Sequence, residues 1–169
     1  MDYISNHDLL LKNLLYLSVI VQAIAVFLGV VIMLTLLLKL KKIAESRSHM
    51  SQAPNMMGPL MMFLSSAVLL AIPTFLSITL NTIWGTDSPM AYNTGNSGVD
   101  QMMEPVLAFV RLLGVISFIR GFLMLSRHNG EQGQPGHLSK SFMHILGGIF
   151  CMHVVGSSYL VLNLMGCFS

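Results

Sequence analysis

Two arginines and two histidines inside apolar segments are the side chains that could carry chemistry in this sequence. Arg111 and Arg120 are nine residues apart in one segment, and His144 and His153 are nine apart in the next. A helix turns about 100° per residue, so each spacing puts its two side chains on opposite faces. The arginines therefore cannot line one pore together, and the histidines cannot hold one haem between them. We interpret both histidines as packing or interfacial side chains, with a ligand or a proton relay as the alternatives.

Motifs of catalysis are absent from the sequence. It contains no G-x-S-x-G, H-E-x-x-H or Walker A pattern. The apolar segments hold no Asp or Glu, which argues against a proton- or cation-coupled carrier. Cys151 and Cys167 form no C-x-x-C pair, and on one helix they would lie about 24 Å apart, too far for a disulfide. We predict no enzyme, no catalytic residue, no metal site and no cofactor.

The composition predicts that lipid surrounds most of the chain. Of its 169 residues, 54% are hydrophobic and 9% charged, whereas soluble domains are about 25% charged. The net charge of +2 comes without a Lys/Arg block, so we expect no direct binding of nucleic acid.

Four segments are apolar enough to cross a membrane, each close to the roughly 20 residues that a helix needs. Since backbone groups in lipid must bond internally, the segments should be helices. The fold class is then an all-α membrane protein with one domain over residues 1–169, and no internal repeat is evident in the sequence. The predicted spans are 14–38, 59–80, 105–125 and 142–165.

Helix boundaries follow from caps and prolines. A capping pattern at Ser5 predicts that the first helix begins near Asn6 and ends near Lys41–Lys42. Pro59 and Pro105 fit the first turn of their helices. Pro73 lies inside the second span and should kink it, either as a tolerated proline or as a moving hinge.

The basic residues set the expected orientation. The loop 81–104 has no Lys or Arg, whereas the loops on either side of it along the chain are basic. The positive-inside rule then predicts an N-out/C-out topology, with Trp84 and Tyr92 as interfacial anchors of the outer loop. The basic residues of these two loops are Lys39, Lys41, Lys42 and Arg47 after the first span, and Arg127 and Lys140 after the third.

Small residues predict that the third and fourth spans pack closely, because such residues let helix backbones approach one another. The glycines either serve only this contact or also meet another subunit. The candidates for helix packing are Gly114, Ser117 and Gly121 in the third span and Gly147, Gly148 and Gly156 in the fourth.

The arginines fit a membrane span because each lies about 7 Å from its middle, one toward each interface. Long side chains at that depth can extend to the headgroups. We expect Arg120 to reach toward cytoplasmic headgroups and Arg111 toward Glu104, with a lipid phosphate or another subunit as alternative partners of Arg111.

The third and fourth spans, "LLGVISFIRGFLML" and "SFMHILGGIFCMHVVG", are joined by a loop containing "GQPG". This part of the chain, about the C-terminal third to half, resembles the small inner-membrane proteins of the type IVB (Dot/Icm) secretion apparatus, of the DotV or DotE/IcmC type, and their relatives in conjugative plasmids. The residues that carry the resemblance are Gly114, Arg120, Gly121, His144, Gly147 and Gly148.

The resemblance implies a multi-pass protein of the bacterial inner membrane. It would be a structural subunit of a hetero-oligomer, in contact with membrane lipids and with larger polytopic subunits such as the DotA type. A small self-assembling channel or holin-like pore is the alternative.

Overall fold

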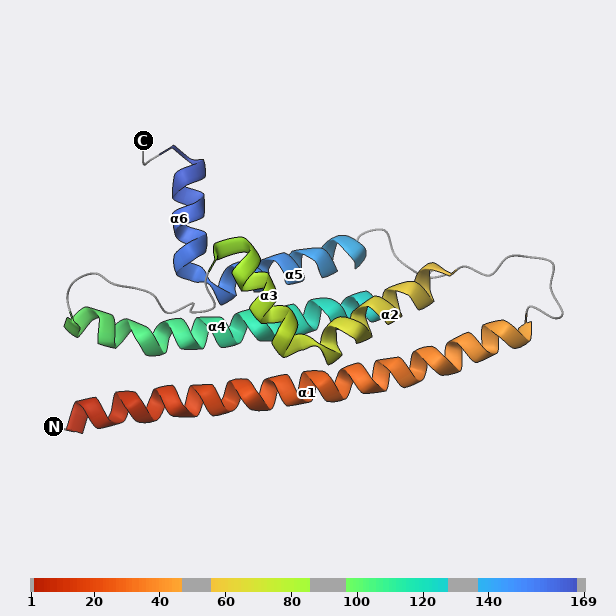
Figure 1. Cartoon of the computed structure of the whole chain (residues 1–169), viewed down its shortest axis with the longest axis horizontal. Coiled ribbons are helices and arrows are strands. Elements are labelled where there is room, and N and C mark those ends of the chain that lie inside the picture. Colours follow the sequence, from red (N-terminus) through yellow and green to blue (C-terminus); the bar gives the residue numbers. More distant parts are fainter. Residues whose placement is uncertain (1, 47–55, 86–96, 128–136, 167–169) are drawn as a thin grey trace.

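Every element in the described part of the chain is an α-helix (Figure 1). The computed structural model describes residues 2–46, 56–85, 97–127 and 137–166. The helices are α1 (Asp2–Ser46), α2 (Met57–Leu70), α3 (Ile72–Trp84), α4 (Ser97–Ser126), α5 (His137–Met152) and α6 (Val154–Leu164).

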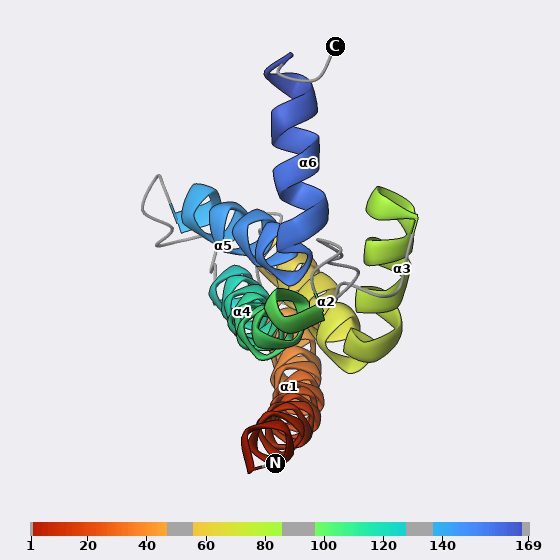
Figure 2. The same cartoon turned by 90° about the vertical axis from the view of Figure 1, so that its left-hand side faces the viewer.

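The helices form two similar triplets. Figure 1 shows α1 and α4 running in the same direction, while α2 and α5 return antiparallel to them. The third helix of each triplet turns sharply away, and Figure 2 shows α3 and α6 extending in the same direction from the bundle. The triplets pack through contacts of α4 with α1 and α2. The structure thus contains a repeated arrangement that the sequence did not indicate, because the two triplets share geometry and not residue identities.

Two helices are long and apolar enough to cross a membrane alone, over Leu9–Glu45 in α1 and Met102–Ser126 in α4. The segments 59–80 and 142–165, expected as single helices, are each broken. The α2–α3 pair bends by 87° and the α5–α6 pair by 103°. The chain therefore has two candidate spans, or up to four if each bent pair counts as one.

Proline causes the first break. Pro73 occupies the first turn of α3, where its missing N–H costs no hydrogen bond. Continuing α2 through it would leave one carbonyl unpaired and press the proline ring against the preceding turn. The chain instead leaves helical geometry at Ala71, whose N–H still donates to Ala67 O at 3.1 Å. At Pro73, where the sequence predicts a kink, the chain instead breaks into two helices that meet at 87°.

A histidine forms the second break. His153 has non-helical backbone angles, and its Nδ1 accepts a hydrogen bond from the Gly156 N–H at 2.9 Å, which caps the start of α6. The Trp84 ring at the end of α3 stacks on the imidazole, with centroids 4.9 Å apart and planes 7° from parallel. Histidine is not a usual cap residue, so no sequence pattern predicts this break.

Two predicted helix starts are wrong. α1 begins at Asp2, so Ser5 lies inside the helix, and α1 continues to Ser46. α4 begins at Ser97, which places Pro105 within it. One interior proline removes a single backbone hydrogen bond, a loss that a long helix can absorb.

The closest helix contact joins α4 to α5. A Cβ added at Gly148 would lie 2.8 Å from both Gly114 O and Phe118 N, and one added at Gly114 would lie 2.8 Å from Gly148 O. Ser117 Oγ adds a hydrogen bond to His144 O at 3.2 Å. Gly121 likewise faces the Ser141 and Ile145 backbone of α5. The two helix backbones are therefore in direct contact.

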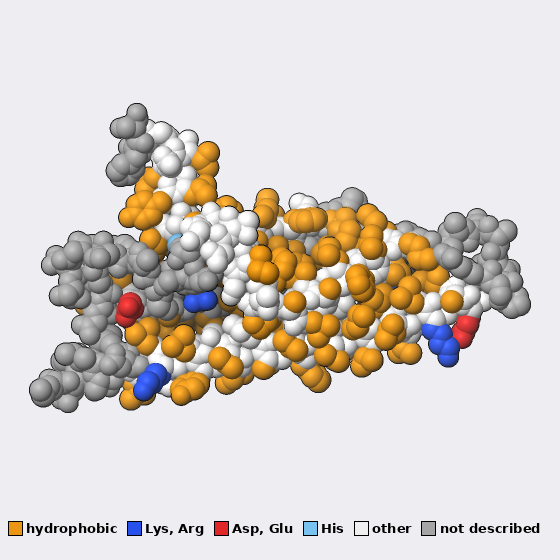
Figure 3. All heavy atoms as spheres, in the orientation of Figure 1, with side chains coloured by type: hydrophobic (Ala, Val, Ile, Leu, Met, Phe, Trp, Pro, Cys, Tyr) orange, Lys and Arg blue, Asp and Glu red, His pale blue; other side chains and the backbone are white. Residues whose placement is uncertain are grey.

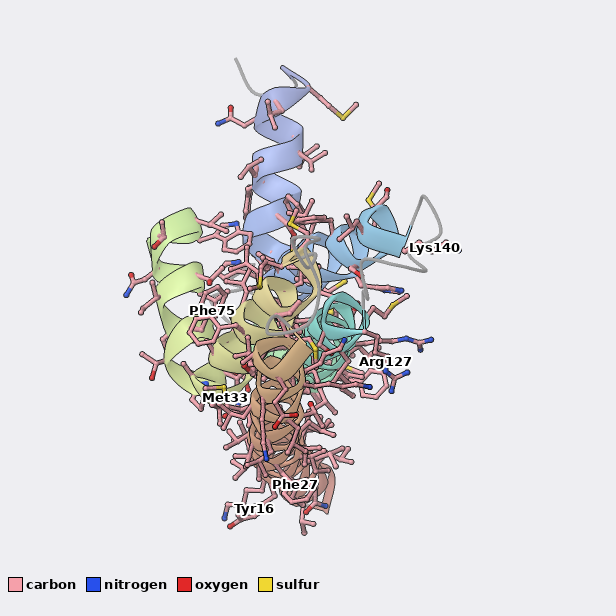
Figure 4. The ribbon with its side chains drawn as sticks, turned by 90° about the vertical axis from the view of Figure 1, so that its right-hand side faces the viewer. Tyr16, Phe27, Met33, Phe75, Arg127 and Lys140 are labelled. Carbon is pink, nitrogen blue, oxygen red and sulfur yellow. The ribbon has the colours of Figure 1, made fainter. Side chains whose placement is uncertain are left out.

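The core lies where the triplets meet. Phe118 is fully buried there, with the ring centroid of Phe75 at 5.8 Å and that of Phe122 at 4.9 Å. Outside the core the surface is apolar, and Figure 3 shows orange side chains covering the middle of one face with charges toward its ends. Figure 4 shows Tyr16 and Phe27 on the face of α1 that points away from the other helices. Both side chains are 68% exposed, as suits a lipid-facing helix.

Neighbouring glycines allow a matched test of the α4–α5 contact. Gly148→Ala should destabilise the chain by about 1–3 kcal/mol, because the new methyl group meets the α4 backbone. Gly147→Ala adds the same group where nothing lies within 4 Å, and should cost nothing. Thermal unfolding in detergent measures both. Equal losses would show that the contact is not as close as described.

The cap at the second break predicts a difference between two substitutions of His153. His153→Leu removes the acceptor of the Gly156 N–H and should cost about 1 kcal/mol, whereas His153→Asn keeps an acceptor and should cost less. Trp84 is the only tryptophan of the chain and stacks on His153, so its fluorescence follows unfolding at this point. A leucine variant as stable as the wild type would contradict the capping role.

Candidate functional site: an arginine pocket between the helices

A cavity of about 130 Å³ lies between α1, α3, α4 and the end of α5. Most of its wall is apolar, but Arg111, Gln22 and Ser18 also line it. The full lining is Leu14, Leu15, Ser18, Gln22, Leu76, Leu80, Ala108, Arg111, Leu112, Val115 and Met152.

Helical periodicity brings the polar groups together. On α4, Ala108, Arg111 and Val115 recur at three- and four-residue spacing and so share the face that meets α1. On α1, Ser18 and Gln22 are four residues apart and face the same space. Ala108 and Val115 are buried on either side of Arg111, so packing of α4 fixes the position from which the guanidinium extends.

The positive charge of Arg111 has no counter-charge in the described part of the chain. Its side chain is half-buried, and no hydrogen bond or ion pair joins it to another described residue. The expected approach to Glu104 is not seen, and that carboxylate is exposed. Ser18 Oγ donates to Leu15 O at 2.7 Å, which leaves its oxygen as an acceptor. A guanidinium with five N–H donors thus faces a small space inside an apolar bundle.

Arg120 has a different environment. Its side chain is exposed, while its neighbour Gly121 is buried against α5. The opposite-face prediction for the two arginines agrees with this placement. Arg120 is available to lipid headgroups or to another protein, whereas Arg111 is directed inward.

The six candidate packing residues fall into three places. Gly114, Ser117, Gly121 and Gly148 lie in the contact between α4 and α5. Gly147 faces open space outside that contact. Gly156 lies instead against Trp84 and His153, at the break before α6.

The histidines lie apart in the fold. His144 is half-buried on α5, and His153 is buried at the break. Trp84 Nε1 and His153 Nε2 are buried and have no hydrogen-bond partner among the described residues. No group of three His, Cys, Asp or Glu that could hold a metal occurs within the described ranges. Tyr92 and Cys167 lie outside those ranges.

Ser18 and Gln22 were not among the predicted site residues. They are polar residues inside the long apolar run of α1, and their spacing places them on one face. That signal was present in the sequence, but only the fold shows that this face meets Arg111.

Comparison with protein-family models, with curated proteins and with solved structures finds no match for this chain.

Proposed function

We propose that this chain is a structural subunit of a membrane-embedded assembly, and that it associates with other polytopic proteins. One observation carries the proposal: the chain buries little of its longest apolar helix. Only 17% of the most apolar stretch of α1 is buried within the bundle. In a membrane such a surface suits lipid and neighbouring helices.

The topology we propose has four spans, with each bent helix pair acting as one broken span. Its support is the return of α2 and α5 along α1 and α4, which leaves the C-terminal ends of α1 and α4 and the start of α5 toward the same end of the bundle (Figure 1). Lys39 and Lys42 lie near the C-terminal end of α1, Arg127 follows the end of α4, and Lys140 lies in the first turn of α5. By the positive-inside rule this end faces the cytoplasm, and both termini lie outside.

We infer the kind of assembly from the resemblance of the last two spans to type IVB secretion proteins. We propose a type IVB secretion apparatus, or a related conjugation apparatus, in the bacterial inner membrane. The chain would be one component of a hetero-oligomer in which polytopic subunits such as the DotA type are possible partners.

The outer face of α5 is the contact surface we propose for such a subunit. Gly147 lies there among Met143, Leu146 and Phe150, which are 71%, 51% and 43% exposed. An open glycine between large apolar side chains lets a second helix approach closely. Its neighbour Gly148, about 100° further round α5, already contacts α4.

A small self-assembling pore is the second candidate, and the Arg111 pocket is the observation that favours it. The pocket supplies polar groups within an otherwise apolar bundle. Ion flux through liposomes that contain only this protein would support a pore and count against the subunit role.

Assembly is tested by copurification from solubilised membranes. Gly147→Leu should lower the recovery of other secretion subunits several-fold while the chain stays folded, because it obstructs the outer face of α5. Ala67→Leu is the control, since Ala67 is exposed on α2. Recovery of the wild type only as a lone monomer would contradict the proposal.

Arg120 offers a second test. Because the side chain is exposed, Arg120→Lys should preserve topology and assembly, whereas Arg120→Glu should reduce both by reversing the charge. Cysteine-accessibility mapping measures the topology, and copurification measures the assembly. Wild-type behaviour of the glutamate variant would show that this charge is irrelevant.

A further inference from the structure

We propose that the Arg111 pocket binds the phosphate group of an anionic phospholipid, from the side of the membrane on which the N-terminus lies. The proposal requires only that the bundle lies in a membrane, so it does not depend on the apparatus assigned above.

The charge of Arg111 calls for an anionic ligand. A guanidinium in hydrocarbon is costly unless it is paired, and the described residues provide no carboxylate for Arg111. The ligand that the pocket takes must therefore be negative. Arginine binds phosphate oxygens through two parallel N–H donors, and the amide of Gln22 can add another donor from α1.

The depth of the pocket along the apolar runs of α1 and α4 fits a lipid headgroup. The pocket extends along α1 from Leu14, the first residue of its apolar run, to Gln22, a distance of about 12 Å. It therefore begins at the edge of the hydrocarbon layer, where headgroups start. On α4, Arg111 lies six residues, or about 9 Å, after Pro105, which begins the apolar run of that helix. An arginine at this depth reaches the headgroup level by extending outward.

The size of the pocket and its position beside the surface of α1 suit a phospholipid. A cavity of about 130 Å³ has room for a few water-sized groups, which suits one phosphate and not a whole helix. Leu15 lines the cavity and is also 54% exposed, so the pocket adjoins the lipid-facing surface of α1. A phospholipid can place its phosphate in the cavity and its acyl chains along that apolar surface.

Native mass spectrometry of the full chain in detergent tests the proposal, with phosphatidylglycerol and phosphatidylcholine added in equal amounts. The wild type should retain phosphatidylglycerol. Arg111→Gln should lower its occupancy about tenfold or more, because charge-assisted hydrogen bonds are lost. Arg120→Gln removes the same charge from an exposed position and should leave occupancy unchanged.

Additional variants keep the test valid if Arg111→Gln does not fold. Arg111→Lys keeps the charge without the paired donors and should bind with intermediate occupancy. Gln22→Leu leaves the arginine in place and should weaken binding by less than Arg111→Gln. Equal occupancy in the wild type and all pocket variants would overturn the proposal.

Two other outcomes would assign the pocket to a different ligand. If millimolar inorganic phosphate displaces the lipid from the wild type, the site binds the free anion and the lipid assignment is wrong. If lipid retention does not depend on Arg111 but Arg111→Gln abolishes copurification of other subunits, the arginine pairs with a partner's carboxylate, and the lipid assignment is again wrong.

Discussion

The direct contact between the α4 and α5 backbones is the interaction on which the rest of the bundle depends. In a membrane, an apolar side chain gains little free energy by exchanging lipid for another helix, because both are apolar. Helices therefore associate through close packing. Gly114 and Gly148 allow that packing, and Phe118 then fills the core beside them. This contact holds α4 in the position from which it meets α1 and α2, and so it also fixes the direction in which Arg111 points.

The sequence predicted the apolar helices but not where two of them break. Hydropathy identifies α1 and α4 because their signal is a long uninterrupted run. The break at Pro73 was foreseen only as a kink, since a sequence does not show how far a helix turns after a proline. The break at His153 depends on the Trp84 ring, which belongs to another triplet and becomes its neighbour only on folding. The repeated triplet was missed for a related reason, because geometry alone relates its two copies.

The candidate site was half visible in the sequence. Arg111 was identified as an unusual charge, and the helical spacing correctly separated it from Arg120. No ion pair joins Arg111 to Glu104, the partner on its own helix, and α1 provides the polar neighbours of the arginine instead. Ser18 and Gln22 are nearly a hundred residues away in the chain, so no local pattern could connect them to the arginine.

The length of α1 has a consequence for the surface of the membrane. Its 45 residues make a rod of about 67 Å, whereas a bilayer with its headgroups is about 40–45 Å thick. Tilt alone would have to approach 50° to hide the excess, beyond the usual range of about 0–40°. A rod of this length that crosses a bilayer must leave part of itself in water, and the end beyond the apolar run carries Lys41 and Lys42. In that arrangement a partner bound to those lysines would be held by a rigid spacer at a fixed height above the lipid.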